Sequence, residues 1–276
     1  MQSQMSALVD LETYPVDALD DEPGLALLNR VRAEFDQTSL AVLDGFLRPE
    51  AVTQVAARAR EDAETLGYRF TGVNNVFLGT SADAGRASDP TDRGGASDPA
   101  DVGRAHTKST LAYDRIGTHS PLKALFQWEP LLGFVSAAVG RPVFRSADPL
   151  GAMTVHVHHD GDEQDWHFDV SEYTIVLHLL APEAGGVLEY VPRSRTAVEQ
   201  DRDTLRAIAD GERHELTREL PTTPGTFVLH SGRISLHRVT PVHGATPRIS
   251  ATLSFNSAPD GRLNDYTRNL YFGRTQ

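Results

Sequence analysis

The chain has 276 residues, of which 39% are hydrophobic, and it carries a formal net charge of −12. This composition supports one sizeable core, so we expect a single domain over 1–276, with mainly helical support in 1–140 and a β-rich core in 141–276. The negative charge disfavours nucleic acid and anionic membrane surfaces as partners, and no long apolar run predicts a transmembrane helix. Because the chain has no cysteine, a metal site would need histidine, aspartate, glutamate or water as ligands.

The N-terminal half shows helical periodicity with one strand. Its first 24 residues are acidic and polar and lack the features of a secretory signal, which predicts a cytoplasmic protein. Apolar spacing predicts a helix over 23–36, a strand follows at 40–46, and an alanine-rich helix is expected over 48–66, with Pro49 in its first turn. These elements are expected to brace a sheet.

The segment 80–105 breaks this pattern. Glycine, alanine, serine, aspartate and proline dominate it, and ASDP occurs at both 87–90 and 96–99. Such a composition has little to bury and predicts a mobile loop. Long loops in compact domains are often functional, so an active-site lid and a tolerated surface insertion both remain open.

The C-terminal half is rich in short strands. A helix over 121–139, interrupted near Pro130, precedes it, and a further helix is expected at 198–210. Short β-rich runs with turn residues between them predict strands at 152–158, 172–180, 187–191, 226–230, 236–242 and 248–256. We therefore expect a mainly β fold with flanking helices, a double-stranded β-helix (jelly-roll or cupin-like) barrel.

Three side chains suggest a metal site. His167 and Asp169 are two residues apart, and residues i and i+2 of an extended chain project from the same face. A second imidazole should come from a distant strand on the same barrel wall, and His237 stands in a β-rich run. Two histidines and one carboxylate leave adjacent positions open on iron(II). His230 competes for the distal position, and His237 is preferred for its distance from Arg248.

Arg248 and Ser250 suggest an anion site. They follow His237 after eleven and thirteen residues and share one face of a strand that we expect beside the His237 strand. A guanidinium can bind a carboxylate through two parallel hydrogen bonds. The alternative for Arg248 is an ion pair with an acidic residue of the chain.

Together these motifs resemble the HxD…H…RxS signature of the iron(II)/2-oxoglutarate-dependent oxygenases. The matching stretches are HFD at 167–169, SLHRVTPV at 235–242 and RIS at 248–250. The resemblance implies an iron site made by His167, Asp169 and His237. It also implies an enzyme that uses O2 and 2-oxoglutarate, with the distal carboxylate of the cosubstrate held by Arg248 and Ser250.

The segment 161–195 is similar to a narrower group, the carrier-independent amino-acid halogenases and their hydroxylating relatives. The likeness rests on WHFD followed by GGVLEYVP. Halogenating members have glycine where this chain has Asp169, which implies hydroxylation here. Desaturation or ring formation with the same cofactors remains open, and a non-enzymatic cupin-like binder and a zinc hydrolase are further alternatives.

Other residues near the motif receive provisional roles. Trp166 and Phe168 alternate with the ligand pair and are expected to pack behind the metal, and His156 and His158 are expected to be hydrogen-bonded structural histidines. The resemblance implies a small substrate, an amino acid or a derivative. The candidate substrate-binding residues are Glu163, Asp165, Glu172, Asn74, Asn75 and Asn256. The sequence leaves open whether the protein forms a homodimer.

Overall fold

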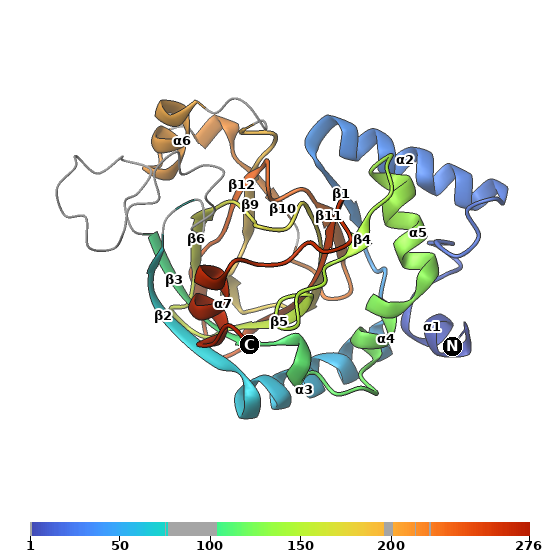
Figure 1. The fold of residues 1–276 in the computed structure, drawn as a ribbon, viewed down its shortest axis with the longest axis horizontal. Helices are drawn as coiled ribbons and strands as arrows, with labels where there is room; N and C mark the ends of the chain where they lie inside the picture. Colours follow the sequence, from blue (N-terminus) through green and yellow to red (C-terminus); the bar gives the residue numbers. More distant parts are fainter. Residues whose placement is uncertain (1, 75, 77–103, 196–200, 213, 221) are drawn as a thin grey trace.

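The computed structural model of the chain describes residues 2–74, 76, 104–195, 201–212, 214–220 and 222–276. A strongly curled antiparallel sheet forms a barrel, and a group of helices covers one outer side of it (Figure 1). The strands are β1 (Leu40–Leu43), β2 (Tyr68–Asn74), β3 (Arg104–Leu111), β4 (Phe144–Arg145), β5 (Met153–His158), β6 (Gln164–His167), β7 (Tyr173–Leu180), β8 (Ala184–Gly185), β9 (Leu188–Val191), β10 (Arg218–Leu220), β11 (Phe227–His230), β12 (Leu236–Val239), β13 (Val242–His243) and β14 (Arg248–Asn256). The helices are α1 (Gln2–Leu8), α2 (Glu22–Thr38), α3 (Pro49–Leu66), α4 (Pro121–Gln127), α5 (Glu129–Ala138), α6 (Arg202–Ala209) and α7 (Asp265–Phe272).

The order of the strands shows two walls. One wall runs β1-β11-β7-β14-β5-β3, and the other runs β6-β12-β9-β10. β3 joins them where His106 pairs with Gln164. From β5 to β14, strands of this sheet that follow one another in sequence lie in opposite walls, except that β9 and β10 are neighbours in the second wall. This alternation is typical of a jelly roll. The predicted fold class is confirmed.

The first wall is apolar on one face and polar on the other. Along β14 the residues from Arg248 to Asn256 alternate between polar and apolar types, because successive side chains of a strand point to opposite faces. The apolar face packs with α2, α3, α4 and α5 into the main core. This arrangement leaves the polar face to line the inside of the barrel.

The helices that brace this wall follow from local sequence signals. α2 and α3 each have proline near the first turn, and α2 ends at Ser39 in a left-handed conformation. Both helices bury one apolar stripe. The predicted helix over 121–139 is two helices, and Pro130 stands in the first turn of α5.

Several strands and two helices, α1 and α7, were not predicted. β2 and β3 bring the N-terminal half into the sheet, so 1–140 supplies more than helical support. β3 begins at Arg104, whereas most of the segment 80–105 lies outside the described residues. α7 was also missed, because only 198–210 was expected to be helical in the second half.

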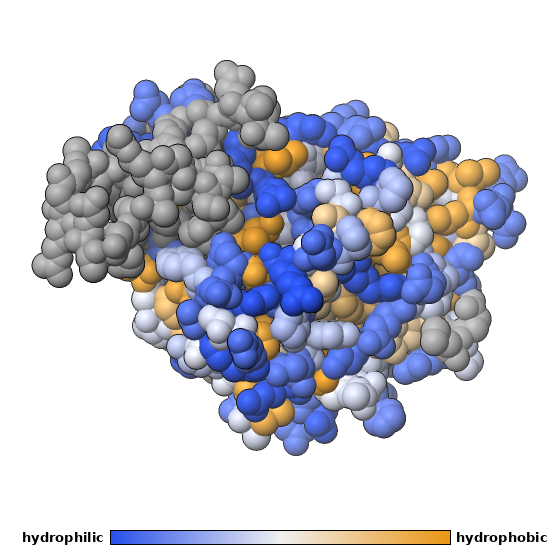
Figure 2. All heavy atoms as spheres, in the orientation of Figure 1, coloured by the Kyte–Doolittle hydropathy of each residue, from blue (hydrophilic) through white to orange (hydrophobic). Residues whose placement is uncertain are grey.

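The surface seen in Figure 2 is mainly hydrophilic, and its apolar residues lie in small separate groups. Among the described residues, the exposed large hydrophobic side chains are Leu25, Leu66, Tyr68, Val73, Phe144 and Tyr266. Within the described part of the chain, no helix is both long and apolar enough to cross a membrane.

Candidate metal centre

His167 and His237 come from adjacent strands of the second wall. β6 and β12 are antiparallel, and His167 and His237 are directly opposite in their register. Both side chains are buried, and their ring centroids lie 4.2 Å apart. The expected second imidazole on the same barrel wall is therefore where the sequence analysis placed it.

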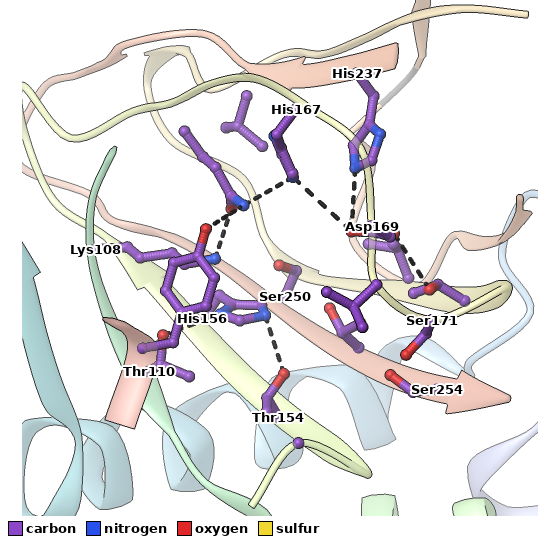
Figure 3. A pocket seen from close by; sticks show the side chains of 18 of the residues that line it. Lys108, Thr110, Thr154, His156, His167, Asp169, Ser171, His237, Ser250 and Ser254 are labelled. Atoms are coloured by element: carbon purple, nitrogen blue, oxygen red, sulfur yellow. Dashed lines mark hydrogen bonds and ion pairs between the residues drawn. The ribbon is translucent and has the colours of Figure 1, made fainter. Parts of the chain in front are cut away.

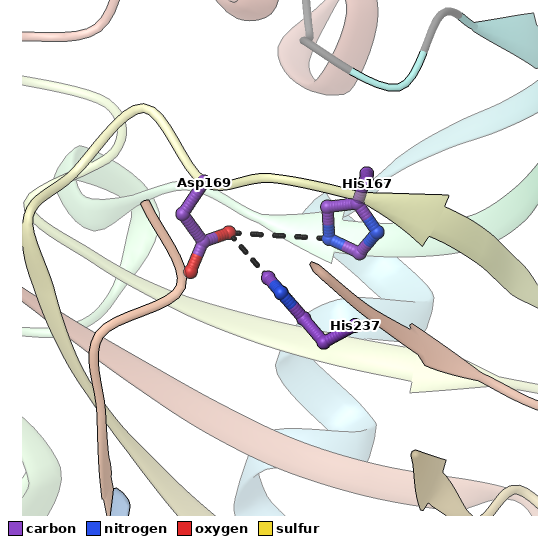
Figure 4. Close-up of side chains that lie close together, drawn as sticks. All are labelled: His167, Asp169 and His237. Atoms are coloured by element: carbon purple, nitrogen blue, oxygen red, sulfur yellow. Dashed lines mark ion pairs between the residues drawn. The ribbon is translucent and has the colours of Figure 1, made fainter. Parts of the chain in front are cut away.

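Asp169 lies just beyond the end of β6 and faces both rings (Figure 4). Its Oδ1 is 3.5 Å from Nε2 of His237 and 3.9 Å from Nε2 of His167. One ligand atom from each of the three residues lies within 4.8 Å of the other two. Ligand atoms bound about 2 Å from one ion lie about 3 Å apart, so small side-chain adjustments suffice for a metal ion.

Backbone carbonyls orient both imidazoles. Nδ1 of His167 donates to the Asp165 carbonyl at 2.8 Å, and Nδ1 of His237 donates to the Ser235 carbonyl at 2.9 Å. Because the proton is on Nδ1 in each neutral ring, Nε2 presents its lone pair towards Asp169. This is the tautomer that a metal ligand needs.

The electrostatics of the site keep the Asp169 carboxyl group ionised and the His167 imidazole neutral. Burial lowers the pKa of His167 well below its usual value, with further contributions from His237 and His106. Burial alone would raise the pKa of Asp169, but the imidazoles of His237 and His167 outweigh it and hold that pKa well below its usual range. His167 and Asp169 are thus in the protonation states that metal ligands need.

Two neighbours of the triad were not foreseen. Gly232 accepts the backbone N–H of Asp169 at 3.0 Å, and a Cβ at this position would lie 2.1 Å from Oδ2 of Asp169. Gln164 contacts Nε2 of His167 through its amide nitrogen at 2.8 Å, so this amide must turn away when a metal binds. In the sequence, only the pattern SGR at 231–233 could have pointed to a role for Gly232.

Arg248 lies in the opposite wall from His237, not beside its strand as expected. β14 pairs with β5 and β7, whereas β12 pairs with β6 and β9. Arg248 and Ser250 do share a face of β14, as expected, and Nη1 of Arg248 donates to Ser250 Oγ at 3.0 Å. The expectation of neighbouring strands was wrong because a jelly roll sends successive strands to alternate walls.

Arg248 has the features of an anion site. It is 1% exposed, and its Nε and Nη2 have no hydrogen-bond partner among the described residues. The alternative role, an ion pair with an acidic residue of the chain, is not seen in the described structure. His158 lies directly opposite Arg248 in the register, and neither of its ring nitrogens has a partner there. An unpaired buried donor is costly, so the group calls for an acceptor from a bound molecule.

The triad and Arg248 line one pocket between the two walls. Figure 3 shows the triad in this pocket together with Ser250 and Lys108. Thr154, His156 and Ser250 add polar groups from the first wall, as the alternation of β5 and β14 dictates. His156 contacts Thr110 at 3.3 Å and Thr154 at 3.0 Å, as expected for a structural histidine. His158 differs from that expectation, because it has no described partner.

The remaining histidine and aromatic predictions have clear outcomes. His230 lines the pocket and packs edge-on against His237, with centroids 4.6 Å apart, but it lies outside the group of three converging ligands. Trp166 and Phe168 pack in a separate apolar cluster behind the metal site, as predicted.

The proposed substrate residues are mostly elsewhere. Glu172 pairs with Arg233 at 3.4 Å, and Asn256 accepts the backbone N–H of Glu172. None of the described candidates lines the pocket, which instead contains Lys108 and Tyr271, two residues that the sequence analysis did not select. The candidates are Glu163, Asp165, Glu172, Asn74 and Asn256, and Asn75 lies outside the described residues.

Comparisons with known proteins agree with this site. The family model described as "Halogenase D" matches residues 102–270, more than half of the chain. No curated protein matches the chain.

Several solved structures share the fold. The α-ketoglutarate-dependent epimerase SnoN from nogalamycin biosynthesis has 17% identity and a TM-score of 0.57 over 85% of this chain and 84% of its own. The carbocyclase SnoK of the same biosynthesis has 15% identity and a TM-score of 0.56 over 84% and 87%. An oxidoreductase of the 2OG-Fe(II) oxygenase family from Burkholderia pseudomallei has 15% identity and a TM-score of 0.51 over 85% and 92%.

These findings agree with the resemblance seen in the sequence and with the two walls around the triad. The chain belongs to the halogenase D family and has the fold of the iron(II)/2-oxoglutarate oxygenases.

Proposed function

We propose that this chain is an iron(II)- and 2-oxoglutarate-dependent dioxygenase that hydroxylates an unactivated C–H bond of a free amino acid or a related small polar metabolite. The observation that carries the proposal is a carboxylate, Asp169, facing two imidazoles in the pocket that also contains Arg248, whose Nε and Nη2 have no hydrogen-bond partner among the described residues.

The residues fit the metal and the cosubstrate. His167, Asp169 and His237 would hold iron(II), for which two imidazoles and one carboxylate are a suitable donor set. Arg248 and Ser250 would hold the distal carboxylate of 2-oxoglutarate, which would give the free N–H groups of Arg248 their acceptors.

The bound iron and 2-oxoglutarate supply the oxidation, in which O2, the keto acid and the C–H bond yield succinate, carbon dioxide and an alcohol. The chain contributes geometry and electrostatics. The carbonyls of Asp165 and Ser235 fix the imidazole orientations, and the buried inner face of β14 keeps water away from Arg248.

Hydroxylation is favoured over halogenation by Asp169. The halogenating proteins that this sequence resembles have glycine at this position, which frees a place at the metal for chloride. Here the carboxylate of Asp169 points at both imidazoles and would take that place. The family name therefore does not by itself assign halogenation to this chain.

The test is anaerobic reconstitution with iron(II) and 2-oxoglutarate, followed by exposure to O2 with a panel of free amino acids. We expect succinate formation that a substrate stimulates, with a product heavier by one oxygen atom. Loss of two hydrogen atoms would instead show desaturation or cyclisation, and absence of succinate with every compound would refute the oxygenase assignment.

An Asp169→Gly variant with chloride tests the role of the carboxylate. We expect it to lose hydroxylation, and a chlorinated product would show that Asp169 alone blocks halogen transfer. Iron content and thermal unfolding, measured beside the wild type, show whether the variant is loaded and folded. Chlorination by the wild-type protein would contradict the proposal.

A further inference from the structure

Lys108 is a buried lysine inside the pocket. It belongs to β3 and is 2% exposed. Its Nζ donates to Oε1 of Gln164 at 2.6 Å and lies 4.4 Å from the ring centroid of Tyr271 (Figure 3). In the described structure no carboxylate forms an ion pair with it. An ammonium group has three N–H donors, so it can accept further partners from a bound molecule.

The charges that line the pocket do not balance. Among the described lining residues, Lys108 and Arg248 are the lysine and arginine and Asp169 is the one carboxylate. Burial lowers the pKa of Lys108 to about 7, and an anion bound beside it would favour its charged form. Burial lowers the pKa of His156 and His158 well below the usual value, so these imidazoles are neutral. When Lys108 is protonated, one positive charge is left over. Iron(II) and doubly charged 2-oxoglutarate together carry no net charge, so they would leave this excess unchanged. A buried excess charge is unfavourable unless a counter-charge is present.

Lys108 lies towards the metal rather than towards Arg248. Gln164, its hydrogen-bond partner, also contacts Nε2 of His167 at 2.8 Å. On the sheet, β5 separates β3 from β14, so the backbones of Lys108 and Arg248 are about 10 Å apart. A group bound by Lys108 would therefore lie beside the metal site, while the charges of both Asp169 and Arg248 act on Lys108.

We propose that Lys108 binds a carboxylate of the substrate, so that the pocket selects small organic acids by their acid group. The inference rests on the proposed oxygenase function and specifies its substrate class. The described lining offers no second carboxylate for a substrate ammonium group. An amino-acid substrate is thus recognised more strongly through its carboxylate than through its amine.

The test measures binding without turnover. Free L-amino acids are titrated calorimetrically into anaerobic, iron(II)- and 2-oxoglutarate-loaded protein, and each is compared with its carboxamide and with the corresponding acid that lacks the amino group. We expect the wild type to bind the tightest acid roughly 10- to 100-fold more tightly than its carboxamide. Relative to the amino acid, the corresponding acid without the amino group should lose less affinity than the carboxamide does.

Lys108→Met should remove the preference for the acid over the carboxamide and leave the affinity for 2-oxoglutarate unchanged. Lys108→Arg, which keeps a positive charge, should retain part of this preference. Lys123→Met is a matched control. Lys123 is also buried, with Nζ 4.3 Å from the Tyr113 ring centroid, but it donates to backbone carbonyls and does not line the pocket. We expect this control to keep the preference.

Equal binding of acids and carboxamides by the wild type would overturn the inference, and this comparison needs no variant to fold. A loss of 2-oxoglutarate affinity in Lys108→Met as large as in Arg248→Met would also overturn it, because Lys108 would then serve the cosubstrate. Failure of the wild type to form succinate would instead refute the proposed function, since the binding measurements involve no turnover.

Discussion

His167 and His237 are directly opposite residues of β6 and β12, and each donates its Nδ1 proton to the carbonyl two residues before it. The same local geometry thus occurs twice, although 69 residues lie between the two histidines. Both Nε2 atoms are directed to Asp169 as a consequence. Backbone carbonyls therefore orient both imidazoles before any metal binds.

Replacing the distal histidine should abolish metal binding, whereas replacing its neighbour should not. His237→Asn removes one of three converging ligands, and we expect iron(II) affinity to fall at least about 100-fold. His230→Asn is the matched control, because His230 is equally buried and its ring lies against His237. Iron content after dialysis and anaerobic titration measure the difference. Equal loss in the two variants would contradict the assignment of His237.

A methyl group at Gly232 should disturb the triad without removing a ligand. In Gly232→Ala the new Cβ would lie 2.1 Å from Oδ2 of Asp169 and 2.9 Å from Cε1 of His237. We expect iron(II) affinity to fall roughly 10- to 100-fold, as for other changes that displace metal ligands. Gly117→Ala, whose Cβ would meet no atom within 4 Å, is the control. Unchanged metal affinity in Gly232→Ala would show that the loop yields easily.

Arg248→Met should weaken 2-oxoglutarate binding about 100-fold, because the cosubstrate loses charge-assisted hydrogen bonds. Arg248→Lys should recover only part of this loss, since an ammonium group cannot form two parallel hydrogen bonds to a carboxylate. The measurements are the KM for 2-oxoglutarate and calorimetric titration. Because Arg248 is 1% exposed without a carboxylate partner among the described residues, the methionine variant should remain folded. A small change in 2-oxoglutarate affinity would place the cosubstrate elsewhere.

The buried His178 should make the protein less stable in acid. Burial, aided by the charge of Arg248, lowers the pKa of His178 to about 3. Between pH 6.5 and pH 3 the unfolded chain therefore holds a proton that the folded chain lacks, so stability decreases as pH falls through this window. From pH 6.5 to pH 5 this group should cost about 2 kcal/mol of unfolding free energy.

Urea denaturation at pH 7, 6 and 5 tests this effect. In His178→Gln the dependence on pH should be weaker by about that amount. His119→Gln, at an exposed position, should retain the wild-type dependence. If the two variants respond to pH alike, His178 is not the residue that makes the protein acid-sensitive.

The sequence predicted much of the framework because strand alternation is a local property. The helices α2 and α3 and the strands β5, β7, β9, β11, β12 and β14 correspond to predicted segments. The spacing of His167 and Asp169 also placed both on one side of an extended chain, as observed. β3 was missed because its sequence RAHTKSTL is polar, and α7 because it is only eight residues long.

By itself, then, the sequence determined the types of the candidate ligands and the faces on which they lie, since covalent geometry fixes the period of two along a strand. Only the tertiary structure decided which residues meet. It placed His237 rather than His230 opposite His167, brought Arg248 from the other wall, and added Lys108 from a strand that was not predicted. These contacts depend on how the sheet closes, and closure is set by pairing between strands far apart in the chain.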